Sequence, residues 1–274
     1  MKISVFGLGY VGAVSCGCLA QDGHQVIGVD PNETKVDLIN QGKSPIIEEQ
    51  IGEMLESAVE RGLLSAVTDA ATAVANSDVS LVCVGTPSQK NGSLDLQYVS
   101  SVCQEIGREL SKKSSRHIVV LRSTTLPGTM RGTVIPALEE SSGMVAGQDF
   151  GVCNNPEFLR EGTAVYDYFN PPKIVIGELQ DGDGDVLAEI YKDLDAPLVR
   201  ASVETAEMVK YVDNVWHALK VSFANEIGNI CSELQLDGQE VMEIFCQDEK
   251  LNLSPYYLRP GFAYGGSCLP KDLR

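Results

Sequence analysis

The sequence predicts an α/β fold in which a doubly wound sheet is followed by one long helix. Over about the first 200 residues, short apolar segments typical of strands alternate with segments of helical character, and this alternation is typical of a sheet with right-handed crossovers. A glycine-rich turn lies between the first predicted strand and the first helix. From 202 to 236 the chain has no proline, and its apolar residues recur at helical spacing. We therefore expect one domain over residues 1–200 and a mainly helical region over residues 201–274.

The individual elements follow from these patterns in chain order. A β-branched run predicts a strand at 2–6, and the helix after the glycine turn ends near Gln21. A second strand at 25–29 ends on Asp30, a helix begins near Glu33, and residues 46–61 have apolar side chains at helical intervals. Later strands are predicted at 80–84, 117–121, about 150–153, 173–176 and 197–200. Beyond the long helix we expect a second helix at 238–247 and an irregular tail at 251–274.

Composition and charge narrow the class of protein. No run approaches about 18 apolar residues, and the N-terminus lacks the features of a signal peptide, so we expect neither a membrane span nor secretion. The net charge of −17 disfavours nucleic acid as a partner. Eight scattered cysteines indicate free thiols in a reducing cytoplasm. Cys16 and Cys18 lack the further ligands of a zinc site, so no metal is expected.

The acidic charge is unevenly distributed along the chain. Residues 226–249 contain seven acids and no Lys or Arg. Residues 250–274 contain four bases against the single acid Asp272. We therefore expect an anionic ligand to bind near this last segment, where the sign of the charge reverses.

The glycine turn carries the first candidate site. Gly7-x-Gly9-x-x-Gly12 lies between a predicted strand and helix, and Asp30 follows at the tip of the second strand. In Rossmann-type domains these glycines allow a tight turn, close approach of a pyrophosphate and close helix–strand packing. A carboxylate at the position of Asp30 would accept hydrogen bonds from a ribose hydroxyl and repel a 2′-phosphate. The pattern therefore predicts NAD as the cofactor, although Asp30 alone could also be a helix N-cap.

Hydroxyl and carboxylate side chains follow later strands at the edge where ligands bind in open α/β sheets. Thr86, Ser123 and Thr124 could contact a ligand there, or they could cap the next helices. Glu157 and Glu161 are four residues apart, so in a helix they would share one face. Such a pair could work as acid and base, but an amphipathic surface helix would have the same spacing.

Two further segments could carry chemistry. Lys210 and Asn214 are four residues apart within the long helix, and an ammonium beside a carboxamide suits stabilisation of an oxyanion. A surface lysine near a tolerated Asn is the alternative. Cys268 lies in the segment Gly-Gly-Ser-Cys-Leu-Pro-Lys-Asp, which is a poor core sequence, and Lys271 could lower the pKa of its thiol. We identify Cys268 as the one cysteine outside a plausible packing site, although a loop cysteine need not be catalytic.

Together these motifs resemble one family. GLGYVG, VGTP, STTLPGT, NPEFLREG, TAEMVKYVDN and FAYGGSCLPKD occur in the order seen in the nucleotide-sugar 6-dehydrogenases, and the resemblance extends over all 274 residues. Segments such as KNGSLDL and FANEIGNI are more similar to the members that act on GDP-mannose than to those that act on UDP-glucose.

The resemblance implies a reaction and a role for each candidate residue. The C6 alcohol of the sugar nucleotide would lose two hydrides to NAD, with Cys268 forming a thiohemiacetal and then a thioester that water hydrolyses. Lys210 and Asn214 would stabilise oxyanions. Glu161 or Asp272 would position water or take protons with support from Glu157, and Thr124 would lie by the nicotinamide or bind the water.

The resemblance also assigns binding residues. The NAD contacts would be the glycines Gly7, Gly9 and Gly12 together with Tyr10, Val11, Asp30, Lys35, Thr86, Thr124 and Lys271. The sugar-nucleotide contacts would be Glu161, Lys210, Asn214, His217, Asn225, Tyr256, Tyr257, Arg259, Phe262 and Gly265. The long helix would form a homodimer or a larger assembly, in which the partner contributes to the substrate site.

Family members continue past the cysteine motif into a second α/β domain that holds the nucleotide base. Because this chain ends at Arg274, we expect it to be a truncated chain or a fragment. Three alternatives stay open: a UDP-glucose 6-dehydrogenase, a non-catalytic NAD-binding dimer, and a β-hydroxyacid dehydrogenase. The last of these would have no use for Cys268.

Overall fold

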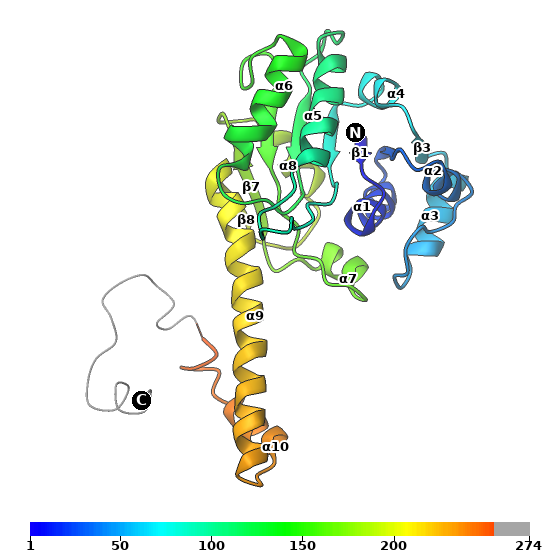
Figure 1. Cartoon of the computed structure of the whole chain (residues 1–274). Coiled ribbons are helices and arrows are strands. Elements are labelled where there is room, and N and C mark those ends of the chain that lie inside the picture. Colours follow the sequence, from blue (N-terminus) through cyan, green and yellow to red (C-terminus); the bar gives the residue numbers. More distant parts are fainter. Residues whose placement is uncertain (255–274) are drawn as a thin grey trace. The chain divides into compact units, whose positions relative to one another are not determined.

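The computed structural model describes residues 1–254, which form parts of two compact units. The first unit comprises Met1–Asp213 and the second begins at Asn214. The first unit is built on one eight-stranded sheet with the strand order β3-β2-β1-β4-β5-β6-β7-β8, and its strands appear among the blue, cyan and green elements of Figure 1. This order confirms the predicted doubly wound, Rossmann-type α/β class.

The eight strands are short and lie close to their predicted positions. Their bounds are Lys2–Phe6 (β1), Gln25–Val29 (β2), Leu64–Val67 (β3), Val79–Val82 (β4), Ile118–Leu121 (β5), Gly151–Asn154 (β6), Ile174–Glu178 (β7) and Leu198–Ser202 (β8). All residues of the central strands β4 and β5 are buried, which explains why their sequences are continuously apolar.

One pairing departs from a fully parallel sheet. β1 to β6 are parallel, but β7 runs antiparallel to β6, and β8 is parallel to β7. An antiparallel neighbour needs no crossover to the opposite edge of the sheet. The connection between β6 and β7 therefore stays at the carboxyl edge, where it contains the segment 155–173.

Helices cover both faces of the sheet. Their bounds are Tyr10–Gln21 (α1), Glu33–Asn40 (α2), Ile51–Glu60 (α3), Ala70–Ala75 (α4), Gln97–Leu110 (α5), Ile135–Ser142 (α6), Ala164–Phe169 (α7) and Asp185–Ile190 (α8), with a π-helical turn at Met130–Val134 before α6. Side chains of α1, α3, α7 and α8 form one hydrophobic core. Those of α4, α5 and α6 form the other, and Figure 1 shows α5 and α6 side by side.

Two local predictions are corrected. Strand β3, at Leu64–Val67, is absent from the predicted elements. The helical pattern over 46–61 forms a helix only from Ile51, since Gln50 has a left-handed backbone with φ of 65° that no helix can include.

The long helix is confirmed. α9 spans Val203–Glu233 and follows β8 directly, as the yellow and orange helix of Figure 1 shows. In the second unit, α10 spans Gly238–Phe245 and is capped by the carboxylate of Asp237, which accepts from the amide of Gln239 at 2.9 Å. Cys246 at the end of α10 is exposed. The expectation that Cys268 alone lies outside a packing site was therefore wrong.

Within the part of the chain that the structure describes, no helix is both long enough and apolar enough to cross a membrane.

A buried polar chain links the middle of the sheet to its neighbouring loops. The hydroxyl of Ser77 donates to Ser4 at 3.0 Å, the hydroxyls of Ser4 and Ser80 lie 2.8 Å apart, and Ser80 contacts Nε2 of His117 at 2.8 Å. His117 is only 1% exposed. Burial, together with the nearby charge of Lys113, lowers the pKa of its imidazole to about 4.

Replacing His117 by Gln should flatten the pH dependence of stability. Between pH 6.5 and about 4 the unfolded chain binds a proton at His117 that the folded chain does not bind, so the wild type loses stability as the pH falls through this window. This loss is on the order of 3 kcal/mol. Urea unfolding of both proteins at pH 7 and pH 4 measures it. Relative to the wild type, the free energy of unfolding of the variant should rise by that amount between pH 7 and pH 4. The same difference in free energy at both pH values would show that His117 does not cause the pH dependence.

Candidate functional site

The glycine turn is shaped by two close backbone approaches. Gly7 has φ of +95°, and its amide donates to the carbonyl of Val29 at 2.7 Å. A Cβ atom on Gly12 would lie 1.8 Å from the carbonyl oxygen of Gly7, so only glycine fits there. A Cβ on Gly9 would meet nothing within 4 Å. Gly9 therefore faces open space at the start of α1, where an anionic ligand could approach the helix N-terminus.

Asp30 connects the end of β2 to this turn. Its carboxylate accepts from the amide of Leu8 at 2.8 Å, from the amide of Asn32 at 3.0 Å, and from Nζ of Lys35 at 3.0 Å. The residue is only 6% exposed. Because a carboxylate offers about four acceptor sites, one site is left for a ligand hydroxyl.

A pocket opens beside these residues. It has a volume of about 430 Å³ and is lined by Gly7, Gly9, Asp30, Lys35, Gly85 and Tyr98, among others. This volume is within the usual range for a small-molecule site. The structure thus brings together, around one pocket, four of the residues expected to contact a dinucleotide.

The hydroxyl residues after β4 and β5 have different roles. Thr86 donates through Oγ1 to the carbonyl oxygen of Thr124 at 2.8 Å, so these two candidate residues lie side by side at the carboxyl edge. The hydroxyl of Ser123 is buried and donates to the carbonyl oxygen of Val84 at 2.6 Å. The position of Ser123 is therefore explained by the fold alone.

The segment that contains Glu157 and Glu161 is an irregular loop and not a helix. The expectation that four-residue spacing puts both carboxylates on one helical face is therefore wrong. Pro156 and Gly162 flank the segment, and both disfavour a continuous helix. Instead, side chains from other elements hold the loop in place.

Glu157 pairs with the candidate catalytic lysine. Its Oε1 lies 3.0 Å from Nζ of Lys210, with side chains that are 11% and 9% exposed. The ring of Phe158 lies beneath two cations, 5.6 Å from Nζ of Lys210 and 4.7 Å from Nζ of Lys173. Lys173 in turn pairs with Asp213 at 2.8 Å. The ammonium of Lys210 is thus fixed by a carboxylate and an aromatic face.

Glu161 is exposed at the turn that ends the loop.

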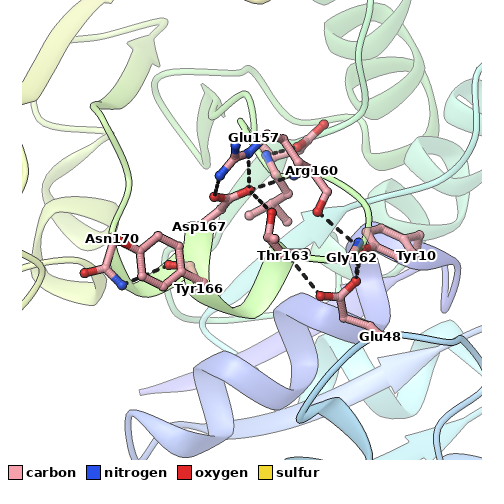
Figure 2. A network of polar contacts seen from close by, with 11 residues as sticks. Tyr10, Glu48, Glu157, Arg160, Gly162, Thr163, Tyr166, Asp167 and Asn170 are labelled. Carbon is pink, nitrogen blue, oxygen red and sulfur yellow. Dashed lines mark hydrogen bonds and ion pairs between the residues drawn. The ribbon is translucent and has the colours of Figure 1, made fainter.

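The loop is anchored at several points in Figure 2. Asp167 accepts from Nη2 of Arg160 at 2.6 Å and from the amide of Arg160 at 2.9 Å. Glu48 accepts from the amides of Gly162 and Ala164, and the hydroxyl of Tyr10 donates to the same carboxylate. Tyr10 is therefore placed between the glycine turn and the loop.

The start of the loop is fixed by a buried cation. Arg122 at the end of β5 donates through Nη1 to Oδ1 of Asn155 and to the hydroxyl of Tyr191, the latter at 2.7 Å. Asn155 also donates to the carbonyl of Val175 at 2.8 Å. These bonds join β5, β6, β7 and the end of α8.

Glu207 connects α9 to the loop that follows Thr124. Its carboxylate accepts from the amide of Gly128 at 2.7 Å and from the amide of Met130 at 2.9 Å, and the residue is 1% exposed. Burial raises the pKa of Glu207, and these two hydrogen bonds oppose the rise. Because Glu207 lies one turn before Lys210 on the same helix, it helps to place the lysine.

The remaining candidate residues are less closely defined. Val11 lies in the first turn of α1, and Asn214, His217 and Asn225 lie along α9 in the second unit, where they are exposed. The candidates Tyr256, Tyr257, Arg259, Phe262, Gly265, Cys268, Lys271 and Asp272 lie outside the described residues. Within residues 1–254 no group of three or more His, Cys, Asp or Glu side chains could hold a metal ion.

Sequence reasoning assigned no role to Glu48, Arg122, Lys173 or Glu207. A weak signal existed for two of them. Arg122 directly follows a buried apolar strand, and Glu207 lies on the inner face of an otherwise apolar helix segment. A charge in such a place requires a buried partner. Nothing in the local sequence marks Glu48, because Tyr10 is 38 residues away and the partner amides of Gly162 and Ala164 are more than 100 residues away.

Comparison with known proteins gives consistent similarities. Residues 1–195 match the NAD binding domain of the UDP-glucose/GDP-mannose dehydrogenase family, and residues 204–274 match the central domain of that family. The chain is 62% identical over 274 residues to a GDP-mannose 6-dehydrogenase of Pseudomonas aeruginosa. It is 38% identical over 278 residues to a UDP-glucose 6-dehydrogenase of Haloferax volcanii. A crystal structure of a ternary complex of GDP-mannose dehydrogenase from P. aeruginosa matches with a TM-score of 0.98 and 62% identity.

These similarities cover this chain but not the whole of its relatives. The two alignments include 100% and 99% of this chain, and 63% and 64% of the P. aeruginosa and H. volcanii proteins respectively. The crystal structure match includes 100% of this chain and 63% of the other. The chain thus spans less than two thirds of the length of the relatives it matches.

Replacing Glu207 by Ala should strongly destabilise the first unit. The change leaves the buried amide of Met130 and the part-buried amide of Gly128 without this acceptor, which costs about 2–4 kcal/mol. Glu204→Ala is the matched control, because Glu204 pairs with Arg131 at a partly exposed position and such pairs contribute less than about 1 kcal/mol. Urea unfolding measures both free energies. Equal losses in the two variants would contradict the role given to Glu207.

Proposed function

The chain belongs to the UDP-glucose/GDP-mannose dehydrogenase family, and we propose that it oxidises the C6 alcohol of GDP-mannose to the carboxylate of GDP-mannuronate with NAD. The observation that carries the choice of substrate is the difference in identity. The chain is far more similar to the GDP-mannose 6-dehydrogenase of P. aeruginosa than to the UDP-glucose enzyme of H. volcanii, over nearly the same residues.

The residues around the pocket fit an NAD molecule. Gly12 leaves no room for a side chain, and the open space at Gly9 lets phosphates approach the amides of Tyr10 and Val11. Asp30 retains an acceptor site for a ribose hydroxyl, and its charge disfavours the extra phosphate of NADP. Lys35, Thr86 and Thr124 would complete the contacts, together with Lys271 outside the described residues. When bound, NAD supplies the acceptor for hydride.

The overall oxidation determines what the chain's own residues must do. Converting an alcohol to a carboxylate removes two hydrides and adds the oxygen of one water, so each uronate requires two NAD. After the first oxidation, the thiol of Cys268 adds to the aldehyde carbon and forms a thiohemiacetal. Loss of the second hydride gives a thioester. Water then hydrolyses the thioester, which releases the carboxylate and restores the thiol.

Lys210 is placed to stabilise the oxygen of these intermediates. An ammonium has three N–H donors, and only one is directed at Glu157. The others can donate to a developing oxyanion in a site that is largely shielded from water. Asn214, four residues farther along the helix, is proposed to act with it. Glu161 or Asp272 would position water or take protons, and Thr124 would lie near the reacting carbon.

We also propose that the second unit forms a homodimer. Among its described residues only Cys231 is buried, whereas Val215, Leu219, Ile230 and Ile244 are each more than half exposed. Apolar side chains along a helix are typically covered by a partner. His217 and Asn225, and the sugar-nucleotide residues beyond 254, would then complete the substrate site with help from the partner. Buried free thiols and the use of NAD are both typical of the cytoplasm, which is the proposed compartment.

Counting NADH against uronate tests this function. Incubation of the protein with NAD and GDP-mannose should give two NADH for each uronate formed, and UDP-glucose should react much more slowly. One NADH for each sugar would contradict the thioester route. Faster turnover of UDP-glucose would contradict the proposed substrate.

Two cysteine variants complete the same experiment. Cys268→Ser should lower uronate formation by at least roughly 100-fold, because an alkoxide is formed far less readily than a thiolate. Cys246→Ser is the matched control, since this exposed thiol lies at the end of α10 and has no proposed role. Equal activity of the two variants would remove Cys268 from the mechanism.

A further inference from the structure

Glu48 makes a hydrogen-bonded clamp between two parts of the site that are far apart in the sequence. Its Oε2 accepts from the amide of Gly162 at 2.8 Å, and its Oε1 accepts from the amide of Ala164 at 2.9 Å. The hydroxyl of Tyr10 donates to Oε2. Figure 2 shows the carboxylate of Glu48 between Tyr10 and the turn at Gly162.

Only a carboxylate can satisfy this clamp. The groups that face Glu48 are the hydroxyl of Tyr10 and the amides of Gly162, Ala164 and Val165, and all of them are donors, so both of its oxygens must accept. A glutamine has one accepting oxygen and one donating nitrogen. In either orientation its nitrogen would face an N–H group of the loop, and at least one hydrogen bond would be lost. Although burial raises the pKa of Glu48, the bonds from Tyr10, Gly162 and Ala164 lower it on balance, so the group is ionised at neutral pH.

The clamp joins elements with different tasks. Tyr10 is the first residue of α1 and directly follows Gly9 of the glycine turn. Gly162 directly follows Glu161, and the same loop carries Glu157, the partner of Lys210. The loop is fixed at its start by Asn155 and internally by the pair of Arg160 with Asp167. A displacement at Tyr10 would therefore be passed to a loop that has little freedom to absorb it.

We propose that Glu48 is a positioning residue that couples occupancy of the dinucleotide pocket to the geometry of loop 157–163. The inference rests on the proposed function, since it takes NAD as the ligand and a substrate-binding role for the loop. Thermodynamic linkage makes such coupling reciprocal. A sugar nucleotide that orders the loop would in turn favour NAD binding at the glycine turn. Glu48 itself does not line the dinucleotide pocket, so its effect on NAD is indirect.

Amide hydrogen exchange at Gly162 and Ala164, followed by NMR on the full chain, tests the coupling. In the wild type, saturating NAD should slow exchange at both amides by about fivefold or more. In Glu48→Gln, exchange without NAD should be roughly tenfold faster because a charged hydrogen bond is lost. The effect of NAD on the amide of Ala164, which is linked to Tyr10 only through Glu48, should disappear, while the affinity for NAD stays close to that of the wild type.

Two further variants identify the route. Glu49→Gln removes the same charge from the exposed neighbouring residue and should behave as the wild type. Tyr10→Phe leaves the bonds from Gly162 and Ala164 to Glu48 in place. It removes the hydroxyl that donates to Glu48 and that also accepts from the amide of Gly162 at 3.1 Å, which breaks the link to the glycine turn. Exchange at Ala164 without NAD should then stay near the wild-type rate, because Tyr10 makes no bond to that amide, and the slowing caused by saturating NAD should be lost.

The outcomes separate this inference from the proposed function. If Glu48→Gln binds NAD and the loop amides slow as in the wild type, the coupling is overturned. It is also overturned if NAD binds the wild type without slowing them. If the wild type does not oxidise GDP-mannose but NAD still slows the loop amides through Glu48, the coupling holds and only the proposed reaction fails. Absence of NAD binding overturns both.

Discussion

The buried ion pair between Lys210 and Glu157 is the interaction on which the candidate site depends. A charge that is shielded from water is tolerated only with a partner and further hydrogen bonds. This requirement brings the beginning of α9 against the loop that follows β6. Glu207 lies one turn earlier and also needs hydrogen-bond donors for its buried carboxylate. The backbone amides of Gly128 and Met130, in the segment before α6, provide them. The buried carboxylate of Glu207 and the largely buried carboxylate of Glu157 thus fix the position of Lys210 relative to the sheet.

The direction of β7 explains why the loop that carries Glu157 lies at the edge of the sheet where the other candidate residues are. Because β7 returns antiparallel to β6, the connecting chain remains at the carboxyl edge, which is also where the glycine turn and the residues after β4 and β5 lie. Asn155 and Arg122 fix the start of that connection, and Glu48 fixes its far end to Tyr10. The cofactor turn and the proposed catalytic lysine are therefore both linked by polar contacts to the same loop.

Sequence reasoning predicted the parts of this structure that depend on local periodicity and on motif. The glycine turn, Asp30, the buried strands and the long helix all followed from spacing and residue type. Long-range contacts leave little trace in the local sequence. Glu48 has no local signal at all, and for Arg122 and Glu207 the only signal is a charge placed in an apolar segment. The helical reading of Glu157 and Glu161 failed for the same reason. Side chains that are remote in the sequence, such as Glu48 and Lys210, hold that loop in place. The four-residue spacing of its two glutamates therefore does not predict its conformation. The antiparallel direction of β7 could not be predicted either, because the sequence of a strand does not indicate whether its neighbour runs parallel or antiparallel to it.

In the proposed reaction, the ammonium held by Glu157 acts on the oxygen at the oxidised carbon. A crystal structure of the full chain with NAD and GDP-mannose tests this most directly. We expect the C6 oxygen of the sugar to lie about 3 Å from Nζ of Lys210 while the pair with Glu157 stays intact. A sugar nucleotide bound with its C6 oxygen remote from Lys210, in a site where the lysine contacts Glu157 alone, would rule out this role for Lys210.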